Sequence, residues 1–64
     1  MQIRYDVETD TLRIRFSLSP IFESDEEKAG FILDYDKDGQ IVAMELLNAS
    51  KRIENPRAVE LVAA

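Results

Sequence analysis

The stretch FILDYDKDGQIVAMELL, residues 31–47, holds the two most apolar pieces of the chain. Asp-Lys-Asp-Gly at 36–39 separates them. An Asp-Gly pair between two apolar runs is the strongest short-range signal of a β-hairpin, so residues 30–36 and 40–47 are predicted to form two antiparallel strands. Because both strands are apolar on both faces, each face needs a cover. We expect a C-terminal helix to cover one face, and curling of the sheet or a second chain to cover the other.

Strict alternation of apolar and polar residues marks two further strands before this hairpin. It runs through residues 2–5 and again through 11–16, and each pattern is typical of a half-buried strand. The polar stretch at 6–10 is short enough to join them as an antiparallel hairpin. Alternation places three arginines on the face opposite the core, and these are Arg4, Arg13 and Arg15.

The remaining segments are predicted from their turn and cap residues. After Pro20 comes an acidic stretch, which we predict to be an edge strand at 21–25 running into a loop near Gly30. Residues 49–53 are ambiguous and fit a single turn that redirects the chain. An Asn-Pro pair followed by apolar residues at helical spacing predicts a helix at 56–63.

These elements predict one domain over residues 1–64, of the α+β class and mainly β: a small antiparallel meander sheet of about five strands with one C-terminal helix. The strands are expected at 2–6, 11–17, 21–25, 30–36 and 40–47. The expected core consists of Ile3, Tyr5, Leu12, Ile14, Phe16, Phe31, Leu33, Val42, Met44 and Leu46. Which face of the last two strands looks inward stays open, because a register change of one residue exchanges the faces.

The composition excludes several classes of chemistry. The chain has 64 residues, a net charge of −5 and neither cysteine nor histidine, so disulfide, thiolate and imidazole chemistry are absent. A deep catalytic cleft is hard to build at this size, so we expect no enzyme and no cofactor, with a calcium ion as the alternative. The negative charge disfavours nucleic acid as a partner. The first twenty residues lack an apolar run, so we expect no signal peptide, no membrane association and a cytoplasmic location.

One motif points to that calcium ion. Residues 34–45 satisfy the calcium-loop pattern D-x-D-x-D-G-x5-E, with Asp34, Asp36, Asp38 and Glu45 as candidate ligands. In such loops, oxygens at alternate positions converge on the cation, glycine permits the turn and the distant glutamate closes the coordination sphere. Helices flank a calcium loop, whereas the residues before Asp34 favour a strand. The alternative is a charged hairpin tip, in which Glu45 lies too far along the next strand to close the site.

The three arginines Arg4, Arg13 and Arg15 are the candidate partner-binding residues. Guanidinium groups on neighbouring strands can hold a carboxylate or a phosphate bidentately. The alternative is a solvated face on which the arginines pair with Glu45 or with the acidic segment 23–27, because surface charge pairs are common and weak.

Self-association is the partner prediction that the residues themselves support. A chain of this length without disulfides, and with two strands that need cover on both faces, gains most by burying its second face against a copy of itself. We therefore expect a homo-oligomer, with a symmetric dimer as the favoured form.

Four stretches together resemble the domain-of-unknown-function 2283 family of short prokaryotic proteins: MQIRYD at 1–6, DTLRI at 10–14, ILDYDKDGQIV at 32–42 and ELLNAS at 45–50. The resemblance covers nearly the whole chain, and the tail from Glu54 is its least typical part. It implies a small antiparallel sheet with a terminal helix, and a hairpin in place of a calcium loop. Genes of this family often lie beside a small toxin-like partner, which implies an antitoxin-like role against a small basic protein. No catalytic residues carry over.

Two functions remain. The first is a small protein-interaction module, antitoxin-like or partner-neutralising, that acts by surface binding. The alternative is a calcium-binding module that uses the Asp34–Glu45 loop. A calcium titration followed by tyrosine fluorescence separates them, because Tyr35 lies inside the candidate loop.

Overall fold

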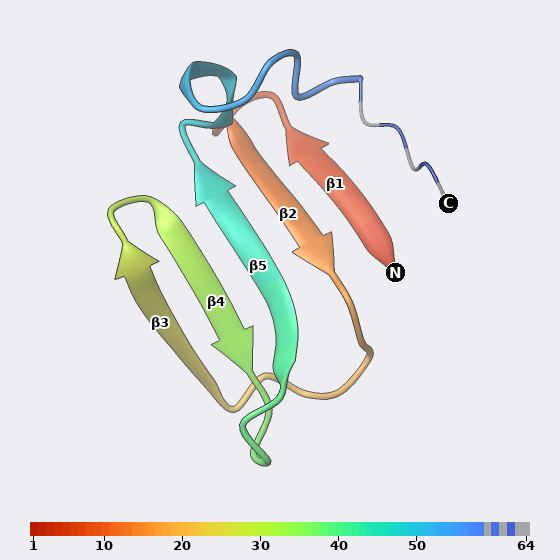
Figure 1. The fold of residues 1–64 in the computed structure, drawn as a ribbon, viewed down its shortest axis with the longest axis vertical. Coiled ribbons are helices and arrows are strands. Elements are labelled where there is room, and N and C mark those ends of the chain that lie inside the picture. Colours follow the sequence, from red (N-terminus) through yellow and green to blue (C-terminus); the bar gives the residue numbers. More distant parts are fainter. Residues whose placement is uncertain (59, 61, 63–64) are drawn as a thin grey trace.

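The computed structural model describes residues 1–58, 60 and 62, and these form one open antiparallel sheet with its connections (Figure 1). The strands, in chain order, are β1 (Gln2–Asp6), β2 (Thr11–Arg15), β3 (Glu23–Lys28), β4 (Phe31–Tyr35) and β5 (Ile41–Leu47). A short 3-10 turn, η1 (Ala49–Lys51), follows β5. The prediction of a mainly β fold with five antiparallel strands is confirmed, as is the single turn after the last strand.

The strand order is β1-β2-β5-β4-β3, so the predicted meander is wrong. β2 pairs with β5, and the linker at 16–22 carries the chain along one end of the sheet to the far edge (Figure 1). Strands β2 to β5 therefore form a Greek key. The two most apolar strands, β4 and β5, take interior positions, whereas all of β3 is exposed at the edge, as expected for an acidic edge strand. From β2 to β3 the linker crosses three inter-strand spacings, or about 14 Å. Fully extended, the linker reaches about 23 Å, so it is long enough for this crossing.

The β4–β5 hairpin is confirmed, but its loop is one residue longer than an Asp-Gly turn. The Gly39 amide donates to the Asp36 carbonyl at 3.1 Å, and the Asp36 amide donates to the Gln40 carbonyl at 2.9 Å. Residues 37–39 therefore make the turn. Gly39 has a φ of 79°, which is the left-handed position that ends such a loop and that glycine adopts without a steric penalty.

The predicted core residues share one face of the sheet, as the register shows. One row across the strands contains Ile3, Ile14, Met44 and Leu33, and the next contains Tyr5, Leu12, Leu46 and Phe31. Of the ten predicted core residues, Val42 alone is buried, while Ile3 and Phe16 are 37% and 45% exposed. The described residues form a single layer, so no second layer from this part of the chain packs against the apolar face.

The predicted C-terminal helix is not confirmed, and the described residues contain no α-helix. Asn55, expected at the helix start, has a φ of 46°, and its carbonyl accepts a hydrogen bond from the Ala58 amide at 3.0 Å. This geometry is a turn, because a residue that caps a helix start has an extended backbone. Residues 59, 61, 63 and 64, over which the helix was expected to continue, lie outside the described residues. In the described part of the chain, no helix is long and apolar enough to cross a membrane.

Candidate functional site

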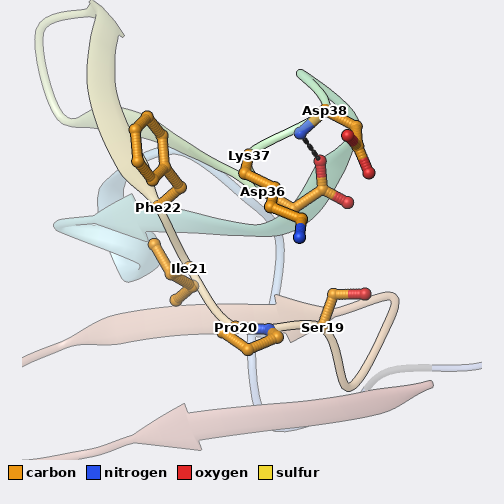
Figure 2. Close-up of a pocket in the computed structure, with 7 residues that line it drawn as sticks. All are labelled: Ser19, Pro20, Ile21, Phe22, Asp36, Lys37 and Asp38. Atoms are coloured by element: carbon orange, nitrogen blue, oxygen red, sulfur yellow. Dashed lines mark hydrogen bonds between the residues drawn. The ribbon is translucent and has the colours of Figure 1, made fainter.

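The linker 16–22 and the β4–β5 loop line an open hollow of about 280 Å³ at one end of the sheet (Figure 2). Its lining consists of Ser19, Pro20, Ile21, Phe22, Asp36, Lys37 and Asp38. Backbone hydrogen bonds hold both ends of the linker: the Phe16 amide donates to the Val42 carbonyl at 2.8 Å, and the Phe22 amide donates to the Tyr35 carbonyl at 2.7 Å. No sequence motif marks this hollow, and the Ile-Phe pair after Pro20 is the one signal that could have pointed to it.

The three arginines lie on the polar face of the first hairpin. Arg4 pairs directly opposite Arg13, and Arg15 lies two residues further along β2, so their side chains share one face. Two guanidinium groups directly opposite each other repel unless carboxylates lie between or beside them. The neighbouring strand β5 supplies one, because Glu45 pairs opposite Arg13 on the same face.

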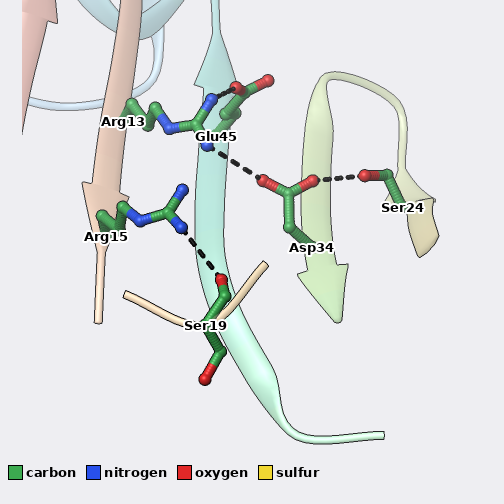
Figure 3. A network of polar contacts seen from close by, with 6 residues as sticks. All are labelled: Arg13, Arg15, Ser19, Ser24, Asp34 and Glu45. Carbon is green, nitrogen blue, oxygen red and sulfur yellow. Dashed lines mark hydrogen bonds and ion pairs between the residues drawn. The ribbon is translucent and has the colours of Figure 1, made fainter. Parts of the chain in front are cut away.

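Arg13 is the centre of a polar network that crosses the sheet (Figure 3). Its Nη1 lies 2.6 Å from Glu45 Oε1, and its Nη2 lies 3.7 Å from Asp34 Oδ2. Asp34 is only 4% exposed, and its Oδ1 accepts a 2.5 Å hydrogen bond from the Ser24 hydroxyl. The network thus joins strands β2, β5, β4 and β3. It compensates a buried carboxylate whose burial would otherwise oppose folding.

The other two arginines have different surroundings. Arg15 donates from Nη2 to the Ser19 carbonyl at 2.9 Å, which holds the linker against the polar face (Figure 3). Arg4 is exposed on the edge strand β1. The structure therefore brings the three arginines to one face, but Arg13 and Arg15 already have partners within the chain. The sequence allowed either partner binding by the arginines or pairing with carboxylates of the same chain, and Arg13 does pair with Glu45.

The candidate calcium ligands lie in two different environments. Asp34 and Glu45 face Arg13 on the sheet, and Asp36 and Asp38 lie in the hairpin loop. Asp36 Oδ1 accepts hydrogen bonds from the amides of Asp38 and Gln40 at 2.9 and 3.0 Å, so it caps the turn. Within the described residues, no group of three or more acidic side chains is arranged to hold a metal ion. The geometry is that of a charged hairpin tip, and calcium binding stays a prediction.

A second polar cluster joins the β1–β2 turn to η1, and no sequence pattern indicated it. Asp10 accepts hydrogen bonds from the Tyr5 hydroxyl and from the Ser50 hydroxyl, both at 2.6 Å, and from the Ser50 amide at 3.0 Å. The Ser50 hydroxyl, followed by the Tyr5 hydroxyl, lowers the pKa of the Asp10 carboxyl, and the bond to Asp10 raises the pKa of Tyr5. Asp10 and Ser50 both fall in the stretches quoted for the family resemblance, which was the only available signal.

Comparison with known proteins gives one match. The family model described as "protein of unknown function (DUF2283)" matches residues 2–50. That range includes all five strands, the Arg13 network and the Asp10 cluster. The search of curated proteins and the search of solved structures found no match.

Proposed function

The chain belongs to the DUF2283 family of proteins of unknown function, and from its surfaces we propose that it is a small protein-interaction module that acts by binding rather than by catalysis. The observation that supports this proposal is the open apolar face of the sheet. Nine of the ten side chains expected in the core stay at least partly exposed on it. Large apolar patches on a folded chain are typical of interaction sites.

The accessible surface supports the same proposal. It amounts to 5006 Å², whereas a compact monomer of 7.3 kDa exposes about 4200 Å². The open apolar face of the sheet accounts for an excess of this kind, which is about 800 Å². Each partner in a standard protein interface buries about 800 Å². Covering this face on association would therefore reduce the accessible surface of the chain to about that of a compact monomer of the same mass.

A second copy of the chain is the proposed occupant of this face. The rows through Ile3 and Tyr5 carry no charged side chain across β1, β2, β5 and β4, and they end at Asp25 and Lys28 on the exposed edge strand β3. Two copies placed face to face over the first four strands therefore bury apolar groups without burying an unpaired charge. Such a contact is closed by a two-fold axis, which gives a symmetric dimer with two packed sheets about 10 Å apart.

Partner neutralisation, in the manner of an antitoxin, is the more specific form of the proposal. The chain carries 13 acidic and 8 basic residues, and the edge strand β3 is acidic and exposed along its whole length. This distribution favours a basic protein as the neutralised partner, because complementary charge speeds encounter and excludes acidic competitors.

Sedimentation velocity at micromolar concentration tests the dimer. Ile3→Glu introduces a charge on the apolar face, and Val7→Glu introduces the same charge at a 55% exposed site in the β1–β2 turn. We expect a dimer for the wild type and for Val7→Glu, and a monomer for Ile3→Glu. A wild-type chain that sediments as a monomer and stays cooperatively folded on dilution would show that the face needs no partner.

A further inference from the structure

The apolar wall of the hollow beside the linker is exposed although its backbone is held in place. Phe22 is 72% exposed and Ile21 is 40% exposed, and both line the hollow next to Pro20 (Figure 2). The Phe22 amide donates a hydrogen bond to the Tyr35 carbonyl, and the Ser19 amide donates one to the Ser17 hydroxyl at 3.0 Å. An aromatic side chain that leaves most of its ring in water on a fixed backbone contributes little to folding, and it is preorganised for burial by a partner.

The opposite wall is acidic. Asp36 and Asp38 line the hollow, and Glu23 and Asp25 line an adjoining one that also includes Phe22. Both ion pairs found among the described residues involve Arg13, so these four carboxylates have no ion-pair partner there. Lys37 is the single cation in the lining of either hollow. Four carboxylates against one ammonium group therefore surround an exposed aromatic ring.

We propose that this hollow binds a segment of a partner protein in which an apolar side chain is next to an arginine or lysine. The apolar side chain packs on Phe22 and Ile21. The neighbouring cation reaches the carboxylates of Asp36 and Asp38, with its aliphatic stem against the ring of Phe22. This inference rests on the proposed function as an interaction module, and its apolar wall is formed by Ile21 and Phe22 of the linker rather than by the rows through Ile3 and Tyr5.

Charge decides the class of occupant. An acidic segment would add like charges to the four carboxylates, and a purely apolar segment would desolvate those carboxylates without compensation. A segment with cations alone would leave the ring of Phe22 in water. Alternating apolar and basic residues satisfy both walls, because successive side chains of an extended segment point to opposite sides.

The probe is the capped hexapeptide acetyl-Ser-Leu-Arg-Leu-Arg-Ser-amide, titrated into the ¹⁵N-labelled protein while amide chemical shifts are recorded. We expect saturable shifts at Phe22, Lys37 and Gly39, and an affinity that falls when salt is added. Replacing both arginines of the peptide by glutamate, or both leucines by serine, is expected to weaken binding by about tenfold or more. Equal binding of all three peptides would overturn the proposal.

Matched variants locate the site. Phe22→Ala and Asp38→Asn are each expected to weaken binding by about fivefold or more. Leu18→Ala, in the same linker and 93% exposed but outside the hollow, and Glu8→Gln, in the β1–β2 turn, are expected to leave it unchanged. Equal losses in variants and controls, or no saturable shift at millimolar peptide, would contradict the inference. Sedimentation of the same samples separates the two proposals. A wild-type dimer that does not bind the peptide would contradict the peptide site but leave the proposed function supported. A wild-type monomer would remove the main support for the proposed function.

Discussion

Arg13 on β2 and Asp34 on β4 meet across the intervening strand β5, with 3.7 Å between the guanidinium Nη2 and the carboxylate Oδ2. Glu45 on β5 takes the other guanidinium nitrogen at 2.6 Å. One side chain therefore links three adjacent strands on the polar face. Because Asp34 is buried, it depends on Arg13 and on the Ser24 hydroxyl to compensate its charge, so removing either partner is expected to cost more than the loss of a surface ion pair.

Arg13→Ser is expected to lower the free energy of unfolding by about 1 to 3 kcal/mol, because it leaves Asp34 buried with its charge uncompensated. Arg15→Ser removes only the bond to the Ser19 carbonyl and is expected to cost less than about 1 kcal/mol. Urea unfolding measures both, and sedimentation of the same variants measures association. Unchanged unfolding with weakened association would instead show that the arginines bind a partner, and no change in either would show that they are merely solvated.

A double variant isolates the buried charge. Asparagine at position 34 can keep the hydrogen bond from Ser24 without carrying a charge. Arg13→Ser combined with Asp34→Asn is therefore expected to be more stable than Arg13→Ser alone. Strictly additive losses in urea would mean that the 3.7 Å contact contributes nothing.

Gly30 and Gly39 share a φ of 79° but differ in their surroundings. A Cβ at Gly30 would lie 2.6 Å from Arg52 Nη2, whereas one at Gly39 would have no neighbour within 4 Å. Gly39→Ala is expected to cost about 1 kcal/mol for the backbone alone. Gly30→Ala should cost about 1 kcal/mol more, because Arg52 must leave its 2.6 Å bond to the Ala29 carbonyl. In an Arg52→Ala background the two losses in urea should become equal, and a persistent difference would exclude Arg52 as the cause.

The structure also gives an expectation for calcium. Asp34 and Glu45, two of the candidate ligands, already bind Arg13, and Asp36 caps the hairpin turn with one oxygen. We therefore expect millimolar calcium to leave Tyr35 fluorescence and the amide shifts of residues 34–45 unchanged. Magnesium at the same concentration controls for ionic strength. Saturable shifts at all four ligand positions with calcium alone would instead establish the calcium-binding function.

The faces of the first two strands could be predicted from the sequence, whereas the neighbours of the strands could not. Alternation assigns Arg13 to the polar face whatever the strand order, because side chains of a strand alternate between faces. In the strand that contains Glu45 both faces are apolar, so alternation left open which of them looks inward. Contact between Arg13 and Asp34 requires the order β2-β5-β4, and this depends on where the linker 16–22 carries the chain. The burial of Asp34 follows from the same order, so local patterning could not reveal it.

Three other features could not be predicted from local sequence patterns, because they depend on contacts between distant parts of the chain or on a segment with more than one compatible geometry. Asp10 and Ser50 are 40 residues apart, and no periodicity joins them. The Asn-Pro pair before the expected helix is also compatible with a turn, and the positive φ of Asn55 selects the turn. The hollow beside Phe22 is lined by residues of both the linker and the β4–β5 loop, so it depends on the fold bringing these two segments together.

The Asp10 cluster makes stability depend on pH in the acid range. Hydrogen bonds from Ser50 and Tyr5 lower the pKa of Asp10 below its usual 3.8 in the folded chain. A carboxyl with a lowered pKa stabilises the fold fully above its unfolded pKa, and this contribution is lost as the pH falls through the folded pKa. Asparagine tolerates the left-handed backbone of position 10, where φ is 53°, so Asp10→Asn removes the charge without backbone strain.

Asp10→Asn is therefore expected to be less stable than the wild type at pH 6, and the difference in urea midpoint should be smaller at pH 2.5, because the contribution of the carboxylate declines as the pH falls below the unfolded pKa toward the lowered folded pKa. Ser50→Ala should remove more of the acid dependence than Tyr5→Phe, because the Ser50 hydroxyl lowers the pKa of Asp10 most. Urea unfolding of the four proteins at both pH values provides the measurement. A wild-type advantage over Asp10→Asn that is the same at pH 6 and pH 2.5 would mean that the ionised carboxylate does not hold η1 against the β1–β2 turn.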